Sequence, residues 1–285
     1  MKTVMNKTLL AVALTSALGV ASTSAMAVVF PYFTVNEASV PAAYPSTFVA
    51  DKITGNYAEV FSVTGPNTFA TSLEWNAGQF VTNNGATTLN TQLNSSQLGG
   101  ATNGYGLYAL YQGQGTFFTS GTTTTFTTTL GVGSLNVWID ANQDTTFTAP
   151  ANGSLAWMTG NTGDDYKIAT GVPQAGYGML DPTLSTCGPN PINPTGSGIN
   201  CGSFGTTTSF LLTTLGKNYF TAPNPFYNLS FQSGQLNNFT IAGTQTINGS
   251  LDVVFGNTVP EPASLALMGI GLMGLGLSVR RRKQA

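Results

Sequence analysis

The stretch that decides the fold class reads Thr68-Phe69-Ala70-Thr71-Ser72-Leu73-Glu74-Trp75. Phe69, Leu73 and Trp75 alternate with small or polar residues, so an extended backbone would turn one face toward a core and the other toward solvent. The same period of two recurs at residues 105–111, 135–139, 227–231 and 251–255. These segments predict β-strands.

The segments between the predicted strands contain residues that favour turns. Examples are Asn83-Asn84-Gly85, Gly113-Gln114-Gly115 and Pro223-Asn224-Pro225. No long stretch between residues 28 and 259 keeps the 3.6-residue period of a helix, and the Thr-rich run at 122–129 favours a strand. Parallel strands need long crossovers, so many short strands without helices favour antiparallel sheets. The sequence predicts an all-β fold, an antiparallel β-sandwich or jelly roll.

The N-terminus has the three parts of a secretory signal peptide. Lys2 and Lys7 provide a basic start, residues 9–21 are apolar, and Ala25-Met26-Ala27 matches an A-x-A cleavage site. We expect signal peptidase to remove residues 1–27 through recognition of Ala25 and Ala27. The exported ectodomain would then span residues 28–259.

The C-terminus combines a short motif, an apolar run and a basic end. Pro260-Glu261-Pro262 precedes the uncharged residues 263–279, and Arg280-Arg281-Arg282-Lys283 follows. A helix over residues 263–279 would be about 26 Å long, close to the minimum for a membrane span. The basic tail at 280–283 would stay in the cytoplasm, so the ectodomain would face away from the cytoplasm, on the other side of the inner membrane.

This order of parts resembles the PEP-CTERM sorting signal of Gram-negative bacteria that make exopolysaccharide. Residues 260–285 carry the resemblance, through Pro260, Glu261, Pro262, Arg280, Arg281 and Arg282. The resemblance implies transient anchoring in the inner membrane and recognition by an exosortase, an integral membrane cysteine protease. Cleavage near the Pro-Glu-Pro triplet would then deliver the ectodomain to the cell surface or extracellular matrix.

Three further segments resemble the flocculation-associated PEP-CTERM proteins, which help extracellular polymer hold cells in flocs. The segments are residues 33–37, residues 48–59 and Val137-Trp138-Ile139-Asp140. This narrower resemblance implies a role in flocculation or biofilm formation.

The ectodomain carries few charges. Residues 28–259 contain three lysines, no arginine and ten acids, a formal charge of −7. Nucleic acid is disfavoured as a partner because phosphate binding depends on clustered Lys and Arg. The abundant hydroxyl and amide groups suit hydrogen bonding to neutral sugars and permit association with exopolysaccharide. Trp75, Trp157 and Tyr177 are candidates to stack on sugar rings, although buried packing is the more common role of such residues.

Cys187 and Cys201 are the two cysteines of the chain. Export to an oxidising compartment favours a disulfide between them, which would stabilise the fold by about 3 kcal/mol for a loop of this length. The alternative, a reactive or metal-binding pair, is disfavoured because the chain has no histidine to join them. The segment from Leu180 to Gly202 is predicted to be a long loop held by this pair.

The absence of histidine removes the commonest general base and the usual catalytic triads. We therefore predict a protein that is not an enzyme. The alternative is a secreted polysaccharide hydrolase, which needs two carboxylates at a set distance. The candidate acids are Glu37, Glu59, Glu74, Asp140, Asp144, Asp164, Asp165 and Asp181.

One acidic segment allows for a metal cofactor. Asp140, Asn142 and Asp144 alternate in a D-x-N-x-D pattern that can place three oxygens around Ca²⁺. The Gly and Glu that an EF-hand loop needs are replaced by Thr145 and Ala151. An Asp/Asn-rich turn between two strands is the simpler interpretation. A calcium-dependent adhesin remains a further alternative, and no other cofactor is predicted.

Overall fold

The computed structural model describes residues 30–41, 43–95, 104–187 and 200–257. Strands dominate these ranges, so the prediction of an all-β fold is confirmed. The predicted signal peptide at 1–27 and the predicted membrane helix at 263–279 lie outside the described residues. Within the described ranges, no helix has the length and apolar character needed to span a membrane.

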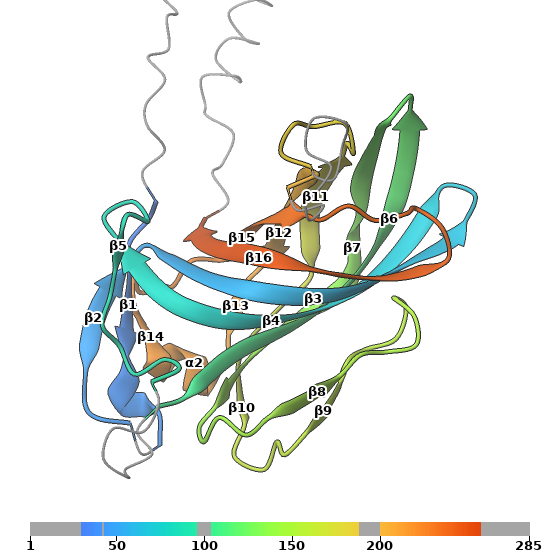
Figure 1. Cartoon of the computed structure of the whole chain (residues 1–285). Coiled ribbons are helices and arrows are strands. Elements are labelled where there is room, and N and C mark those ends of the chain that lie inside the picture. Colours follow the sequence, from blue (N-terminus) through green and yellow to red (C-terminus); the bar gives the residue numbers. More distant parts are fainter. Residues whose placement is uncertain (1–29, 42, 96–103, 188–199, 258–285) are drawn as a thin grey trace, which may run out of the picture.

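Eight strands form a closed antiparallel barrel (Figure 1). Each of these strands pairs with the barrel strand that precedes it in the chain, and the last pairs with the first. The barrel strands are β3 (Lys52–Gly65), β4 (Thr68–Thr82), β6 (Gly106–Ser120), β7 (Thr123–Asp140), β11 (Pro173–Leu180), β12 (Gly202–Ser209), β15 (Leu229–Leu236) and β16 (Thr244–Gly256).

The prediction of a sandwich or jelly roll is wrong, because these strands form one sheet that closes on itself. The closing pair is β16 with β3, which runs from Thr244 opposite Ser62 to Val253 opposite Ile53. Strands of a sandwich and of a barrel both bury one face, so both produce a period of two in the sequence. Closure depends on a pairing between distant segments, which that period does not encode.

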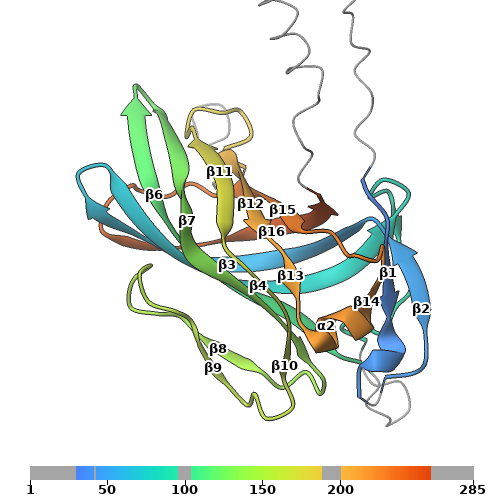
Figure 2. The ribbon, with the colours of Figure 1, turned by 180° about the vertical axis from the view of Figure 1, so that it is seen from behind.

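The remaining elements cover one end and one outer face of the barrel (Figure 2). A small sheet of β14, β1 and β2 lies with α2 at one end, and the β8–β9 hairpin lies against the outside of β3 and β4. In that hairpin segment, the Gly153 N–H donates to Ser62 Oγ (2.9 Å) and the Trp157 indole donates to the Ser72 carbonyl (3.1 Å). The bounds are β1 (Phe33–Asn36), η1 (Glu37–Ser39), β2 (Thr47–Ala50), β5 (Thr87–Thr88), β8 (Thr146–Thr148), β9 (Met158–Gly160), β10 (Tyr166–Gly171), β13 (Leu211–Leu212), α2 (Thr214–Tyr219) and β14 (Phe220–Ala222).

Two clusters of phenylalanines fill the ends of the barrel. At the end covered by β1 and β14, Phe33 meets Phe255 edge to face with 5.0 Å between ring centroids. At the other end, Phe61 stacks on Phe69 at 5.2 Å. Burial of aromatic rings in such contacts supplies much of the free energy of a small core. The first cluster consists of Phe33, Phe80, Phe210, Phe220, Phe226 and Phe255, and the second of Phe61, Phe69, Phe126 and Phe239.

Most of the predicted alternation matches the barrel. Phe69, Leu73 and Trp75 on β4 are buried, as are the core-facing residues predicted at 135–139 and 251–255. The prediction fails at 227–231, because Phe231 is 42% exposed while its neighbour Ser230 is buried. β15 therefore turns its polar residues inward.

Two local predictions need correction. Gly113-Gln114-Gly115 is not a turn but a register shift inside β6, where its pairing with β7 is irregular. The expectation of no helix missed α2, a short helix of six residues whose N-cap, Thr213, accepts the N–H of Gly216 through its hydroxyl (3.0 Å). Asn83-Asn84-Gly85 does form a turn, with positive φ at all three residues.

A disulfide joins Cys187 and Cys201 beyond the ends of β11 and β12. Both cysteines are buried. β11 ends at Leu180 and β12 begins at Gly202, so these strands flank the predicted loop. The disulfide thus fastens the connection between two neighbouring barrel strands.

Candidate functional site

The predicted calcium segment forms a turn at the end of β7. Asp140 is buried, and its Oδ1 accepts the backbone N–H groups of Asn142 (3.3 Å), Gln143 (2.6 Å) and Asp144 (3.3 Å). Its Oδ2 accepts the N–H of Thr145 at 3.0 Å. The carboxylate of Asp140 therefore holds the turn together, as expected of an Asp that replaces backbone acceptors.

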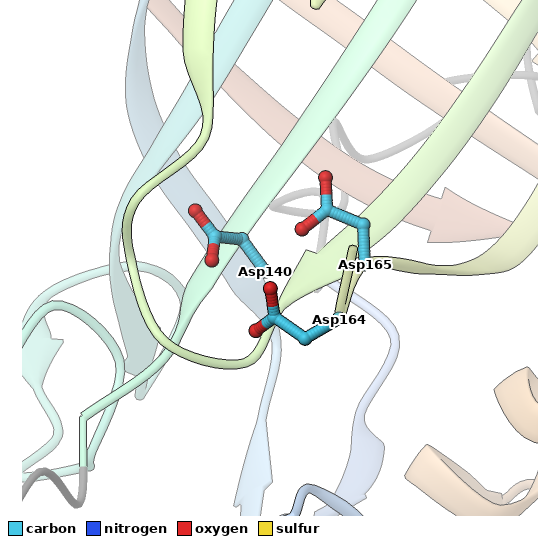
Figure 3. A group of neighbouring side chains, drawn as sticks. All are labelled: Asp140, Asp164 and Asp165. Atoms are coloured by element: carbon cyan, nitrogen blue, oxygen red, sulfur yellow. The ribbon is translucent and has the colours of Figure 1, made fainter. Parts of the chain in front are cut away.

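The acids that lie close to Asp140 in the structure are not the ones that the D-x-N-x-D spacing indicates. Oxygen atoms of Asp140, Asp164 and Asp165 lie within 4.8 Å of one another, and Figure 3 shows the three side chains gathered in one place. Asn142 instead accepts the N–H of Asp144 (3.0 Å), and both side chains are exposed. Asp164 and Asp165 come from the segment before β10, which pairs with the end of β7.

The carboxylates of this cluster differ in the number of hydrogen bonds that they accept. Asp165 accepts the hydroxyls of Tyr108 (2.6 Å) and Thr145 (2.9 Å). Burial raises the pKa of Asp165, with further contributions from Asp140 and Asp164, while the two hydroxyls oppose the rise. Asp164 Oδ2 is buried and has no hydrogen-bond partner among the described residues. Three carboxylates this close repel one another, and a divalent cation with oxygen ligands would relieve that repulsion.

A second candidate site is a groove of about 430 Å³ on the outer face of β11, β12, β15 and β16. Tyr177, Gly205, Ser233 and Asp252 form one row across these four strands, because each is in register with the next. Tyr177 is 59% exposed. Hydroxyl and amide side chains complete the groove: Ser203, Gln235 and Ser250. An exposed ring beside several small donors and acceptors suits a neutral sugar.

Residues 258–283 match the family model of the PEP-CTERM protein-sorting motif. The chain carries this sorting motif. It contains the predicted residues Pro260, Glu261 and Pro262 and the arginines at 280–282, all outside the described ranges. The motif marks an exported protein that an exosortase processes for the cell surface. No curated protein and no solved structure matches the chain.

Two of the acids proposed for hydrolysis, Glu59 and Glu74, lie on opposite faces of the barrel wall. Glu59 is in register with Leu73 and faces the barrel interior, whereas Glu74 is the next residue along β4 and faces outward. Burial raises the pKa of each to about 7. The wall of the barrel separates them, so they do not form the facing pair that hydrolysis requires.

Two other acids have structural partners. Glu37 is buried and accepts the backbone N–H of Gln92 (2.8 Å) and the hydroxyl of Tyr105 (3.1 Å). Asp181 accepts the hydroxyl (2.6 Å) and the N–H (2.9 Å) of Thr183 near the disulfide loop, and these hydrogen bonds lower its pKa. Both carboxylates therefore hold local structure.

The aromatic residues considered for stacking on sugar rings lie in different parts of the barrel. Trp75 is buried inside the barrel and donates to the Leu251 carbonyl (3.1 Å). Trp138 lies on the outer face, stacked with Tyr108 and under the Lys167 ammonium at 4.8 Å. Of Trp75, Trp157 and Tyr177, only Tyr177 is exposed and lines the outer groove.

Sequence reasoning missed the groove and the partnership of Asp164 and Asp165 with Asp140. Both depend on strand register: Tyr177 meets Gly205 and Ser233 only through the pairing of β11, β12 and β15. A usable signal for the acidic cluster was present, since Asp164 and Asp165 directly precede β10, a strand that follows Asp140 after one hairpin.

Proposed function

We propose that the protein is a non-catalytic component of the cell surface and extracellular matrix that associates with exopolysaccharide and contributes to flocculation or biofilm formation. The sorting motif at residues 258–283 carries the proposal. Residues 1–27 act as the signal peptide, residues 28–259 as the working ectodomain, and residues 260–285 as the sorting signal.

The proposed route has two cleavages. Signal peptidase acts after Ala27, and the helix at 263–279 then holds the protein in the inner membrane with residues 280–283 in the cytoplasm. An exosortase next cuts near Pro260-Glu261-Pro262 and releases the ectodomain to the surface or matrix.

Features of the ectodomain support a sugar partner. The groove beside Tyr177 offers a ring and several hydroxyl and amide groups. The segments that resemble flocculation-associated proteins lie in β1, in β2 and β3, and at the end of β7. Phe33 and Phe48 from these segments pack against Phe80 of the barrel. The resemblance thus falls on the sheet that covers one end of the barrel, as well as on its wall.

The route is tested by changing the motif and its processing enzyme. We expect mass spectrometry of the wild-type surface protein to find a C-terminus near Pro260-Glu261-Pro262. Replacing the triplet by alanines, or deleting the exosortase gene, should retain the longer form in the membrane, while Asn257→Ala should process normally. Recovery of wild-type surface protein with Arg282 attached, from cells with active exosortase, would contradict the proposal.

The biological role is tested by deleting the gene while the polysaccharide machinery stays intact. We expect slower settling of the cells and recovery when the wild-type gene is restored. Unchanged aggregation in the deletion strain would remove the proposed role even if processing occurs as described.

A calcium-dependent adhesin is a second candidate, favoured by the buried, unpartnered Asp164 Oδ2 beside Asp140 and Asp165. Calorimetry with Ca²⁺ should show binding to the wild type, loss in Asp164→Asn and no change in Asp144→Asn. The reverse pattern would return the site to Asp140, Asn142 and Asp144. Equal traces without heat for all three proteins would dismiss calcium.

A further inference from the structure

The interior of the barrel is not completely filled. Two cavities of about 60 and about 70 Å³ lie inside it. Native interiors are close-packed and have few voids larger than a water molecule, so space of this size is unusual. The cavities share part of their lining, and the shared side chains separate them: Leu73, Tyr111, Phe204 and Thr206.

The first cavity is mainly apolar. Its lining includes the indole of Trp75 and the side chains of Leu107, Val137 and Leu251. Most of its polar side chains come from the wall formed by β12 and β15, where Gln232 donates to the hydroxyl of Thr208 at 3.0 Å and that hydroxyl pairs with Ser230 at 2.6 Å. Such a space favours an apolar body over water.

The second cavity contains a buried acid. Glu59 points inward from β3 and accepts the hydroxyl of Thr71. Burial raises its pKa to about 7, although the Thr71 hydrogen bond opposes the rise. The hydroxyls of Thr128 and Thr206 line the same cavity. Glu59 is therefore the one carboxyl group in a cavity whose other lining residues are apolar or carry a hydroxyl.

No lysine of the described residues neutralises Glu59. Lys52 pairs with Asp252 at 2.8 Å, Lys167 lies over Trp138, and Lys217 is exposed on α2. An anionic ligand would therefore meet a carboxyl group without any compensating cation. A cationic ligand would lose its hydration against the apolar lining of the first cavity.

We propose that the barrel interior binds a small neutral molecule with an apolar body of about one aromatic ring and a single hydroxyl, which hydrogen-bonds to Glu59. The two cavities together approach the volume of about 150 Å³ at which an engineered apolar cavity binds benzene. Tyr111 and Phe204 line both spaces and are only partly buried. In this proposal the two rings rotate so that the ligand occupies both spaces. This inference is independent of the role in flocculation.

The cluster of phenylalanines beside the second cavity indicates the route of entry. Phe61, Phe69 and Phe126 belong to barrel strands, whereas Phe239 belongs to the connection between β15 and β16. Its neighbours Asn238 and Thr240 are exposed. Movement of Phe239 opens this end without breaking a strand pair.

The test uses the exported protein purified from the producing cells and follows its tryptophan fluorescence, to which Trp75 contributes from the wall of the first cavity, with calorimetry as the second readout. The probes are benzyl alcohol, toluene, benzoate and benzylamine. We expect saturable binding of about one benzyl alcohol per chain, and binding at least about tenfold weaker for benzoate and benzylamine. No saturable binding, or tighter binding of either ion, would overturn the proposal.

Two variants test the named contacts. Glu59→Leu should weaken benzyl alcohol about five- to tenfold, the value of one hydrogen bond, and leave toluene unchanged. Leu73→Ala should strengthen both probes because it removes part of the wall between the cavities. Equal weakening of both probes by Glu59→Leu would contradict the role of Glu59. If either variant does not fold, the four probes on the wild-type protein still decide the proposal.

Discussion

The two walls of the barrel differ in the side chains that they turn toward the interior. Along β3 and β4, large apolar residues such as Phe61 and Leu73 face the interior. Along β12 and β15, Thr208 and Ser230 are buried, whereas Phe231 of β15 faces solvent. Tyr177 of the neighbouring strand β11 also faces solvent. The buried hydroxyls are tolerated because they bond to each other at 2.6 Å. An inward position is therefore defined by register, and the polarity of a side chain follows from its partners.

The test with the largest expected effect on stability compares two phenylalanines on neighbouring strands. Phe255 faces inward among Phe33, Phe210 and Phe226, whereas Phe231 faces outward one position away in register. We expect Phe255→Ala to lower the unfolding free energy by about 3–5 kcal/mol, because the site cannot fully collapse. Phe231→Ala should change it by less than about 1 kcal/mol. Chemical denaturation measures both, and equal losses would invalidate the assignment of faces.

A second test concerns the buried acid. The folded protein holds the Glu59 proton more tightly than the unfolded chain, so the unfolding free energy falls as pH rises from about 4.5 to about 7. Glu59→Gln removes this ionisation. We expect the variant to be more stable than the wild type by up to about 3 kcal/mol at pH 8, because each tenfold change in proton affinity is worth about 1.4 kcal/mol. At pH 4 the two proteins should be equally stable.

Asp181 provides the control of opposite sign. Hydrogen bonds from Thr183 and Thr123 lower its pKa, so the folded state favours its ionised form. Asp181→Asn should therefore lose stability at neutral pH, with the difference fading as the pH falls through the folded pKa. Thermal unfolding at several pH values measures the stability of the Asp181→Asn and Glu59→Gln variants. A Glu59→Gln variant that is less stable than the wild type at pH 8 would contradict an uncompensated buried carboxyl.

The outer wall is tested at the turn after β7. Asp140→Asn replaces the carboxylate that accepts four backbone N–H groups, and we expect a loss of about 2 kcal/mol. Asp144→Asn, four residues later and exposed, should be neutral within about 0.5 kcal/mol. Denaturant titration in excess chelator measures the pair without a contribution from metal. Similar losses would mean that Asp140 does not organise the turn.

Local patterns predicted much of this molecule but not its closure. The alternation at residues 69–75 and 251–255 identified strands and their buried faces, because each strand buries one side against a core. Phe231 was assigned to the wrong face, since Ser230 and Gln232 satisfy each other inside the barrel through contacts that involve β12. The pairing of β16 with β3 joins residues nearly 200 positions apart, so no short window contains it.

The candidate sites divide in the same way. The sorting motif was predicted from residues that follow one another in the chain, and residues 258–283 match its family model. Asp140 was identified from its spacing, but Asp164 and Asp165 reach it through the register between β7 and β10, which shifts between Lys167 and Ala169. Tyr177 was named as a candidate, whereas the groove around it depends on three strand pairings.

The smallest expected effect on stability belongs to Tyr177, where the outer face would contact sugar. Tyr177→Ala removes an exposed ring, so the unfolding free energy should stay within about 0.5 kcal/mol of the wild type. Binding to the producer's own polysaccharide should weaken about fivefold, the value of one aromatic contact. Affinity electrophoresis measures this, with Phe118→Ala as the control because Phe118 is 66% exposed but lies outside the groove. If both variants bind equally well, sugar does not use the groove, although the fold and the route to the surface would stand.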